Sequence, residues 1–417
     1  MPSAAQVEAV LRRHVLDAWF PRSLDTAQGG FLCDFDRSWR PVGPHDKLLE
    51  FHSRHLCAAA DACRLYPDES RFQDATERGF RYLREVFWDH QSGGWFHRLD
   101  RAGRPLEAAT KHAHGIAYAL DACVAVYETN GDPAALELAK AGFEWLDRHS
   151  WDSEHGGHFG FLTREGRAIR EPAQSPEAGA PDTIGTPVGL KDHNVHCDLL
   201  ETFIRLYRIW PDSTVAKRLA ESVDIVANRM LVPETGAVHY YMTHDWRPVP
   251  HAVRSGYQFQ AAYRLTMAPE LTGAIDLLRE RAVALVGHVL RHSRDENGGF
   301  FYASTGAMPL ELEGHSLVVK RKPWWVQAEG LKTLLVMSRL FPENPLYQQE
   351  FSTLWEVFES QYLDPRHGGV YTNGIRRRAR LLGLLPKADS RKGSVWKDAR
   401  HEARSLLTCL ELLREKP

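Results

Sequence analysis

Six short segments of this sequence gather histidine, arginine, tryptophan and carboxylate side chains at helical spacing. They span residues 47–54, 111–114, 192–201, 254–260, 322–329 and 396–404. A histidine can take the proton next to a carbonyl, an arginine or a second acid can stabilise the resulting enediolate, and tryptophan faces can bind a sugar ring. No GxGxxG or GxxxxGK[ST] phosphate loop accompanies them, so neither NAD nor ATP chemistry is indicated and no cofactor is expected. The pattern favours proton transfer on a sugar.

Plain structural roles compete with this interpretation in the first and fifth segments. Glu50 and Arg54 are four residues apart and can form an ordinary helix ion pair. Trp324 and Trp325 can belong to an apolar core, although Gln327 beside them argues against a wholly apolar environment. Both alternatives stay open on the sequence alone.

The histidines have structural alternatives as well. His193 and His196 are three residues apart and could ligate a metal ion. Asp198 or Glu201 would supply the next ligand, but no second cluster with ligand spacing appears in the sequence. A single histidine such as His401 is more often a core or surface residue than a catalyst. What favours a catalytic role for His401 is its equivalent place in the sixth segment.

A repeated turn indicates how these segments are positioned. An acidic residue, a few polar residues and a Gly-Gly pair recur, followed by an aromatic or apolar residue, as in Asp25-Thr-Ala-Gln-Gly-Gly-Phe31. The second residue of the pair falls at positions 30, 94, 157, 299 and 369, and a degenerate Gly-Ala copy falls at 237. Glycine permits the positive φ of a tight turn, and the alternation that follows suits a short strand. Six copies, 62 to 80 residues apart, indicate six repeated units.

Stretches of helical periodicity flank each turn. We expect twelve helices, at approximately residues 4–19, 46–66, 70–87, 110–129, 133–149, 192–210, 213–230, 254–268, 270–292, 323–341, 345–361 and 395–413. Six helix pairs joined by hairpins are enough to close an all-α (α/α)6 barrel with short β-hairpins at one mouth, and one such domain accounts for residues 1–417. An open solenoid is the competing architecture. In the barrel the helices after the hairpins form the inner ring, and their N-terminal turns, with positive dipole ends that suit an anionic intermediate, meet at one mouth.

Composition narrows the class of protein. With 52 Lys and Arg against 54 Asp and Glu, the net charge of −2 excludes a general nucleic-acid binder. No apolar run approaches the roughly 18 residues of a membrane helix, and the first residues do not resemble a signal peptide. Six cysteines without a CxxC pair are expected to be reduced thiols. A cytoplasmic protein, monomeric or homodimeric, is therefore expected, with no nucleic-acid or membrane partner.

A basic segment between residues 371 and 394 has two interpretations. It carries Arg376, Arg377, Arg378, Arg380, Lys387, Arg391 and Lys392. It is either a solvated surface loop or a contact for an acidic group of the substrate or of a neighbouring subunit. The small-molecule sugar expected as substrate is therefore either neutral or anionic.

Several segments together carry a resemblance to a known family. Lys322-Pro-Trp-Trp-Val-Gln-Ala-Glu329 is similar to K-x-W-W-x-Q-A-E, and Trp396-Lys-Asp-Ala-Arg-His-Glu-Ala-Arg404 is similar to W-K-x-x-Y-H-x-x-R. Residues 194–201 resemble N-x-H-x-H-x-x-E, and residues 47–54 resemble the early segment that supplies a substrate-binding arginine. Nearly the whole chain thus resembles the N-acylglucosamine 2-epimerase superfamily, which includes cellobiose 2-epimerase and mannose isomerase-type aldose–ketose isomerases. The resemblance implies an (α/α)6 barrel, no cofactor, and reversible proton transfer between C1 and C2 of a sugar through an enediolate.

The resemblance also implies the residues of the site. His401 is one acid/base and Arg54 binds the sugar oxygens. The other implied substrate-binding residues are His114, Asn194, Asp198, Trp324, Trp325, Gln327, Glu329 and Trp396. The chain departs from the family on the eighth helix, where Gly256-Tyr257-Gln258-Phe259-Gln260 stands in place of G-H-x-x-E.

This departure leaves the second acid/base open. Tyr257 stands where a histidine is expected, and it would need a pKa depressed from about 10 to act as a base. His196 is the second candidate for the catalytic role, with His251 and His114 as further ones. Asp198 also stands where a second histidine is expected, and His114 stands where tyrosine is common.

Two other classes of function stay open beside a sugar isomerase or 2-epimerase. A carbohydrate hydrolase or lyase on the same barrel would need two carboxylates across the sugar. Its candidate acids are Glu50, Asp198, Glu329 and Glu402. A sugar-binding or regulatory protein with a decayed site would bind sugar without turnover.

Overall fold

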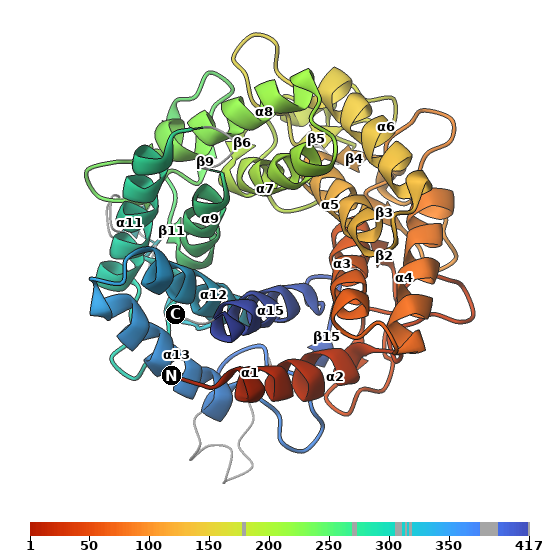
Figure 1. Cartoon of the computed structure of the whole chain (residues 1–417). Helices are drawn as coiled ribbons and strands as arrows, with labels where there is room; N and C mark the ends of the chain where they lie inside the picture. Colours follow the sequence, from red (N-terminus) through yellow and green to blue (C-terminus); the bar gives the residue numbers. More distant parts are fainter. Residues whose placement is uncertain are drawn as a thin grey trace.

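Two concentric rings of helices surround the axis of the molecule (Figure 1). The computed structural model describes residues 1–176, 181–268, 273–304, 311–312, 315–316, 319–375 and 391–415. The inner ring consists of α3 (Leu49–Leu65), α5 (Ala113–Asn130), α7 (His193–Ile209), α9 (Ser255–Met267), α12 (Trp324–Leu340) and α15 (Arg400–Arg414). The outer ring consists of α1 (Ala4–Val10) with α2 (Asp17–Trp19), α4 (Ser70–Tyr82), α6 (Pro133–Ser150), α8 (Ser213–Asp224), α11 (Ile275–His292) and α13 (Pro345–Gln361). The helices predicted from periodicity therefore occur in the expected order.

Short irregular helices complete these rods. Three π-helical segments lie in the outer ring: Leu11–Leu16 joins α1 to α2, Leu83–Phe87 extends α4, and Ile225–Arg229 extends α8. Two 3₁₀ turns, Glu107–Ala109 and Pro172–Gln174, lie in the connections.

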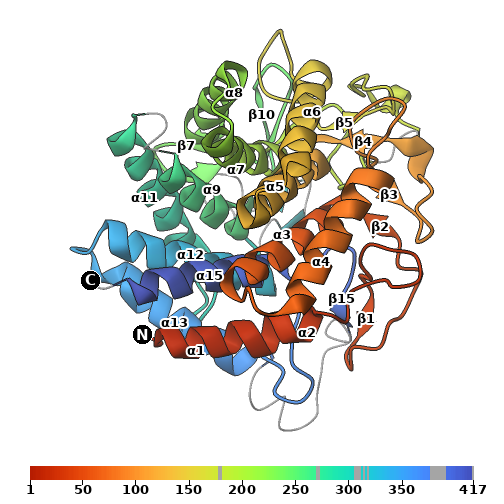
Figure 2. The same ribbon diagram turned by 45° about the vertical axis from the view of Figure 1, so that its right-hand side comes forward.

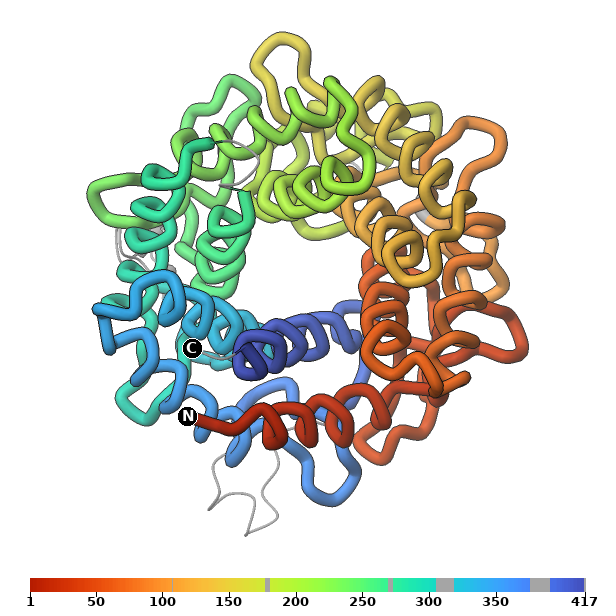
Figure 3. The backbone as a smooth tube through the Cα atoms, in the orientation of Figure 1, coloured from red at the N-terminus to blue at the C-terminus, as the bar shows by residue number. Residues whose placement is uncertain are grey.

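The inner ring is closed (Figure 3). Each inner helix packs on the next in the order α3, α5, α7, α9, α12 and α15, and α15 packs in turn on α3. The first outer helix, α1, covers the last inner helix, α15. The predicted (α/α)6 barrel is therefore confirmed, and the open solenoid is wrong because the first and last units meet.

The two rings differ in how their side chains are buried. α4 buries Phe72, Ala75 and Gly79 at spacings of three and four, which is typical of a helix with solvent along one side. α5 is buried along nearly its whole length and is rich in alanine. An inner helix is apolar almost all round because it has a neighbour on each side and an outer helix behind it.

Short strands connect the units at one end of the barrel, where Figure 2 shows β1 to β5 and β15 together. The antiparallel pairs are β1 (Phe35–Asp36) with β15 (Arg391–Gly393), β2 (Lys47–Leu48) with β3 (Arg98–Leu99), β4 (Lys111–His112) with β5 (Phe161–Leu162), β6 (Lys191–Asp192) with β9 (Tyr241–Met242), β9 with β10 (Pro248–Val249), β11 (Val253–Arg254) with β12 (Ala303–Ser304), β7 (Leu231–Val232) with β8 (Ala237–Val238), and β13 (Glu311–Leu312) with β14 (His315–Ser316). The strand before each of α3, α5, α7 and α9 thus pairs with a strand of the following unit, which fixes the start of the inner helix.

Each Gly-Gly copy closes a tight turn, as its sequence predicts. The glycines of the five full copies all have positive φ, and the residues on either side pair as antiparallel bridges, for example Trp88 with Trp95 and Leu363 with Val370. In the first copy, Gly29 and Gly30 lie so close to the ring of Tyr82 that added Cβ atoms would come within 3.0 to 3.1 Å of it. The repeat is therefore set both by backbone conformation and by close packing.

A lysine–aspartate ion pair recurs with the turn. The Nζ-to-carboxylate distances are 3.0 Å for Lys47–Asp25, 3.1 Å for Lys111–Asp89, 2.7 Å for Lys191–Asp152, 2.8 Å for Lys322–Asp295 and 2.8 Å for Lys392–Asp364. The degenerate fourth copy has Val232 in the aspartate position and Val253 in the lysine position of the strand, so it lacks both members of the ion pair. These lysines start the inner-helix segments, but their role is to fasten each turn to its unit.

One predicted helix boundary needs correction. α15 begins at Arg400 rather than near residue 395, because Ser394 and Lys397 form an antiparallel bridge there, and Asp398 accepts from the backbone N–H of Arg400 at 2.7 Å. α11 is described from Ile275, and residues 269–272, where the predicted helix begins, lie outside the described residues. No helix in the described residues is long and apolar enough to cross a membrane.

Most of the predicted basic segment lies outside the described residues, which omit 376–390. Its two described members make local ion pairs, Arg391 with Asp34 at 3.3 Å and Lys392 with Asp364 at 2.8 Å. These two cations are therefore held by the protein's own carboxylates.

Candidate active site

A cavity of about 450 Å³ opens at the end of the barrel where the inner helices begin. All six inner helices contribute to its wall, through their first turns or, in α3, through the second turn. Eight residues predicted for the site line it: Arg54, His114, Asn194, Tyr257, Trp324, Trp325, Trp396 and His401. The structure therefore brings together side chains separated by up to 347 positions in the chain.

His401 is oriented by a buried carboxylate. Its Nδ1 donates to Oε1 of Glu329 at 2.8 Å, and its ring lies 5.6 Å from that of Trp325. Burial alone would raise the pKa of Glu329, but the charge of Lys332, 2.6 Å away, and the bond to His401 hold it well below its usual range. Glu329 is thus an anion that fixes the ring of His401 and leaves Nε2 free of that contact for chemistry. Glu329 does not itself line the cavity, so its role is positioning.

His114 bridges two buried carboxylates. Its Nδ1 lies 2.9 Å from Oε1 of Glu50, and its Nε2 lies 3.0 Å from Oδ2 of Asp198. Burial lowers the pKa of His114, but the bonds to Asp198 and Glu50 outweigh burial and raise it to about 9. His114 is therefore an imidazolium near neutral pH, with both N–H groups engaged, and it supplies a fixed positive charge to the cavity wall. Asp198 lies behind His114 and does not reach the cavity.

Arg54 supplies a second fixed charge. Its Nε lies 2.8 Å from Oδ2 of Asp398, and its guanidinium lies 5.1 Å from the ring of Tyr118. Burial lowers the pKa of Arg54, but the charge of Asp398 more than offsets this and keeps it above its ordinary value. Nη2 has no hydrogen-bond partner in the described part of the chain, so it is available for a substrate oxygen. The i, i+4 spacing had suggested an ion pair between Arg54 and Glu50. In the structure Arg54 pairs with Asp398 instead.

Tyr257 and Gln260 occupy the place where the family motif has histidine and glutamate. Burial raises the pKa of Tyr257 to about 12, so the phenol is protonated near neutral pH. Nε2 of Gln260 donates to Oε1 of Glu329 at 3.3 Å. A glutamate at 260 would place a second carboxylate against Glu329, whereas the amide donates to it. The two replacements are therefore consistent with each other and with Glu329 serving His401 alone.

Two predicted residues have backbone partners instead of cavity positions. Nδ1 of His196 donates to the carbonyl of Asp192 at 2.8 Å, and its Nε2 accepts from the N–H of His158 at 3.0 Å. With both nitrogens engaged in the wall of the barrel, His196 is placed as a structural residue, which corrects the catalytic role expected for it. Gln327 likewise bonds the backbone of Phe300 at 2.8 and 2.9 Å and does not reach the cavity.

The predicted site residues leave out much of the cavity wall, although Arg254 and Gln260 belong to the segment 254–260 singled out from the sequence. The further lining residues are Tyr118, Ile184, Tyr240, Arg254, Gln260, Tyr302, Arg321, Pro323, Thr372 and Asn373. Tyr118 follows His114 by four positions, so helical spacing could have found it. Tyr240 and Tyr302 come from connections between helices, where no periodicity marks the side facing the cavity.

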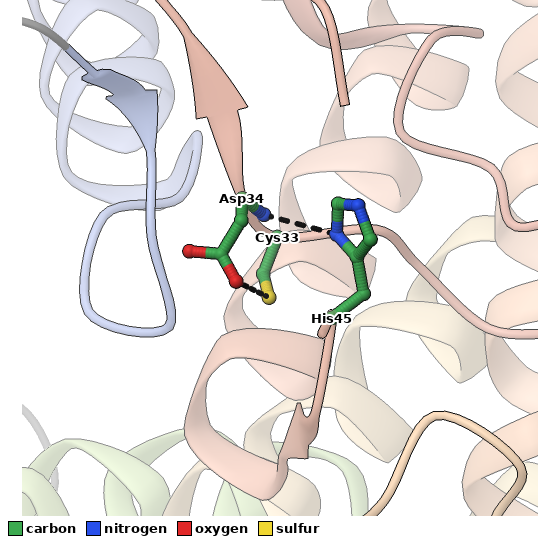
Figure 4. Close-up of side chains that lie close together, drawn as sticks. All are labelled: Cys33, Asp34 and His45. Atoms are coloured by element: carbon green, nitrogen blue, oxygen red, sulfur yellow. Dashed lines mark hydrogen bonds between the residues drawn. The ribbon is translucent and has the colours of Figure 1, made fainter. Parts of the chain in front are cut away.

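One other cluster has the residue types of a metal site (Figure 4). Cys33, Asp34 and His45 are buried, with potential ligand atoms within 4.8 Å of one another, the only such group in the described residues. However, Nδ1 of His45 accepts from the backbone N–H of Asp34 at 3.2 Å, and Arg391 pairs with Asp34. Burial also raises the pKa of the Cys33 thiol well above its ordinary value. A neutral thiol beside a cation fits a hydrogen-bonded structural group better than a cation site.

Known proteins resemble the chain over its whole length. The family model described as N-acylglucosamine 2-epimerase matches residues 29–389. A cellobiose 2-epimerase of Bacteroides fragilis is 26% identical over 415 residues, covering 98% of each chain. Among solved structures, cellobiose 2-epimerase from Bacillus thermoamylovorans superimposes with a TM-score of 0.84 at 18% identity, covering 98% of each chain. A D-mannose isomerase superimposes with a TM-score of 0.80 at 19% identity, covering 99% of each chain.

These matches agree with the barrel fold. The family model spans most of the chain, from the first Gly-Gly turn to the segment before α15. The chain belongs to the N-acylglucosamine 2-epimerase family and is an enzyme of the sugar epimerase and isomerase class.

Proposed function

We propose that the enzyme interconverts an aldose and the corresponding ketose by proton transfer between C1 and C2 of the open-chain sugar. The observation that carries the proposal is His401, which lines the cavity and is oriented by the buried carboxylate of Glu329. Arg54 and His114 add positive charge to the same wall. Such a set of groups suits a reaction whose intermediate is an oxyanion.

The proposed step balances with these groups alone. Nε2 of His401 takes the proton from C2 of the aldose, and the electron pair forms the C1–C2 double bond while negative charge develops on O1. Arg54 and the His114 imidazolium stabilise that charge. The O2 hydroxyl proton passes to O1, the C2–O2 bond becomes a carbonyl, and His401 returns its proton to C1 to give the ketose. The reverse sequence converts ketose to aldose.

The replacement of histidine by Tyr257 favours isomerisation over 2-epimerisation. One base on one face of the enediolate suffices to carry a proton from C2 to C1. Inversion at C2 requires a proton to reach C2 from the opposite face. Tyr257, with its pKa raised to about 12, is a hydrogen-bond donor and a poor base near neutral pH, so the cavity offers His401 as its proton carrier.

A hydrolase on the same barrel is less favoured. Among the described residues no carboxylate lines the cavity. Glu50, Asp198 and Glu329 are each bonded to a histidine and lie behind the wall. Glu402, the fourth candidate, is buried, and burial raises its pKa to about 7. A hydrolase needs two carboxylates that face each other across the sugar, and these four residues do not provide them.

The proposal is tested by solvent-deuterium exchange. A panel of aldoses and ketoses is incubated with enzyme in D2O, and deuterium at C1 or C2 is followed by NMR together with the product formed. His401→Asn is expected to slow exchange and turnover by a factor of about 10² to 10⁴. His90→Asn, an exposed histidine on the second Gly-Gly turn, serves as the matched control. Full activity in His401→Asn, or no exchange with any sugar, would refute the proposal.

A double variant tests isomerisation against epimerisation. Tyr257→His with Gln260→Glu installs the family pair opposite His401. The expected result is a 2-epimer that the natural enzyme does not form at a comparable rate, measured as the ratio of 2-epimer to ketose. Abundant 2-epimer from the unchanged enzyme would show that another group already delivers the proton.

A further inference from the structure

Two arginines of the cavity differ from Arg54 in their surroundings. Arg254 lies half-buried, with its guanidinium 3.9 Å from the ring centre of Tyr240 and 5.8 Å from that of Tyr302. Arg321 is exposed, and its guanidinium lies 4.3 Å from the ring centre of Tyr302. The ring of Tyr302 is therefore shared by two cations.

Neither guanidinium has a counter-ion in the part of the chain that the structure describes. Among the residues that the structure describes, no carboxylate pairs with Arg254 or Arg321. Nη2 of Arg254 instead donates to Nε2 of His251 at 3.1 Å. Burial lowers the pKa of His251 to about 4, so this imidazole is neutral and accepts the bond without offsetting the charge.

The surrounding phenols do not neutralise Arg254 either. Burial raises the pKa of Tyr257 to about 12 and that of Tyr240 well above its ordinary value, so both are uncharged near neutral pH. Ring faces attract a guanidinium only weakly compared with a carboxylate. A partly buried cation without a counter-ion is costly, which makes it a natural partner for an anionic ligand group.

We propose that the substrate sugar carries an oxyanion group, a phosphate ester or a carboxylate, that Arg254 and Arg321 bind inside the cavity. Arginine presents several N–H donors in one plane and binds both kinds of group with paired hydrogen bonds. The pair would therefore select an anionic sugar over the neutral sugar of the same size.

The arrangement of rings places this group away from the reacting carbons. The ring of Trp325 lies 5.6 Å from that of His401 between centres, and 5.1 and 6.2 Å from those of Tyr257 and Tyr302. Arg254 and Arg321 both contact Tyr302, so the rings of Tyr302 and Trp325 link them to His401. The oxyanion is therefore expected at the end of the sugar opposite C1, and this inference rests on the proposed reaction at His401.

Kinetics with matched sugars provide the first test. The kcat/KM values of a hexose, its 6-phosphate and the corresponding hexuronate are compared in the natural enzyme, Arg254→Gln and Arg321→Gln. We expect the anionic sugars to be preferred about tenfold or more, and each substitution to remove most of that preference, because charge-assisted hydrogen bonds are lost. Arg321→Gln is at an exposed position, so its folding is not at risk. The 6-phosphate and hexuronate arms separate the two oxyanion chemistries.

Arg247→Gln is the matched control, because its side chain is 77% exposed on the β9–β10 turn and pairs only with Asp245 in the described residues. Equal kcat/KM for anionic and neutral sugars, or a preference that survives both cavity substitutions, would overturn the inference while leaving isomerisation intact.

A binding measurement separates this inference from the proposed reaction. A hexitol 6-phosphate and the neutral hexitol have no carbonyl and cannot isomerise, so calorimetry reports binding alone. We expect the phosphorylated hexitol to bind at least about tenfold more tightly, with the difference lost in Arg254→Gln and reduced by added salt. That result without turnover of any sugar would support the anion site and refute isomerisation. Equal binding of both hexitols would refute the anion site.

Discussion

The two ends of the inner ring hold arginines in different electrostatic settings. At the far end a cavity of about 320 Å³ is lined by residues of α3, α5, α7, α9 and α15. There Arg64 pairs with Asp61 at 2.6 Å, Arg205 pairs with Glu128 at 2.6 Å and with Asp121, and Arg404 pairs with Glu201. At the catalytic end Arg254 and Arg321 have no such partner among the described residues. Counter-ions therefore separate the paired arginines of the far end from Arg254 and Arg321, whereas Arg54 both pairs with Asp398 and lines the catalytic cavity.

A line of alternating charges joins the two ends. Glu201 of the far-end cavity accepts from Nε of Arg264 at 2.8 Å, and Arg264 also bonds Asp198. Asp198 in turn bonds His114 of the catalytic cavity at 3.0 Å. The charge of His114 therefore depends on a buried network of ion pairs. Its other members, Asp198, Arg264 and Glu201, stabilise the fold. The following changes test where the structural part ends and the catalytic part begins.

The largest expected effect on stability is at the far end. Arg205→Met removes a guanidinium whose side chain is 12% exposed. Glu128 and Asp121 each lose one ion-pair partner. Breaking a buried pair costs about 3–5 kcal/mol, so we expect the free energy of unfolding in urea to fall by that amount while kcat per folded molecule is unchanged. A loss confined to kcat would contradict the division between the two ends.

His114 should make stability depend on pH. Its pKa is raised from 6.5 to about 9 in the folded state, so its contribution is complete below about pH 6.5 and is lost as pH rises through 9. The shift corresponds to roughly 3 kcal/mol. His114→Gln should remove this fall between pH 6.5 and 9, seen as the difference between the two urea-unfolding curves.

The difference between the two urea-unfolding curves is the quantity to measure, because Lys332 gives stability a pH dependence opposite to that of His114. Burial lowers the pKa of Lys332 to about 8 from 10.5, so stability gains from this lysine as pH rises between those values. Lys332 is present in both proteins, so its contribution cancels in the difference. A variant that retains the full pH dependence would show that His114 is not an imidazolium.

Glu329→Gln sharpens the comparison on the catalytic side. An amide still reaches Nδ1 of His401 but no longer stabilises its protonated form. We expect kcat to fall about 10- to 100-fold, or roughly 1.4–2.7 kcal/mol, with KM unchanged. The kcat–pH profile should change as well, because an amide places no negative charge beside the ring. A change in stability with an unmoved profile would make Glu329 purely structural.

The smallest effect is expected at the rim of the far-end cavity. Arg64 pairs with Asp61, but its side chain is 43% exposed. Arg64→Met should therefore cost less than about 1 kcal/mol of unfolding free energy. A cost equal to that of Arg205→Met would mean that exposure does not govern these pairs.

The fold was largely predictable from the sequence because its signals are local. Each Gly-Gly pair needs positive φ, and each helix shows its own periodicity, so twelve helices and six turns follow without tertiary information. The start of α15 was not predictable, because Trp396 and Asp398 continue an apparently helical pattern, whereas Ser394 and Lys397 form an antiparallel bridge and the helix begins only at Arg400.

The site was predictable only in part. Residues at the first turns of inner helices, such as His401 and Tyr257, follow from the repeat. Whether a side chain there faces the cavity or a backbone group depends on long-range partners, as His196 illustrates through its bond to His158. That Arg254 and Arg321 have no counter-ion among the described residues is a property of the assembled cavity, so no local pattern marks it.

The closed ring has a consequence for cooperativity. Repeats stacked in an open array have end units with one neighbour, and these fray first. Here α15 packs on α3, so every inner helix has a neighbour on each side. Opening the ring at any junction would also dismantle the cavity, whose wall draws on all six inner helices. A sugar bound at the mouth therefore stabilises the whole barrel, and saturating ligand should raise the melting temperature of all six units together.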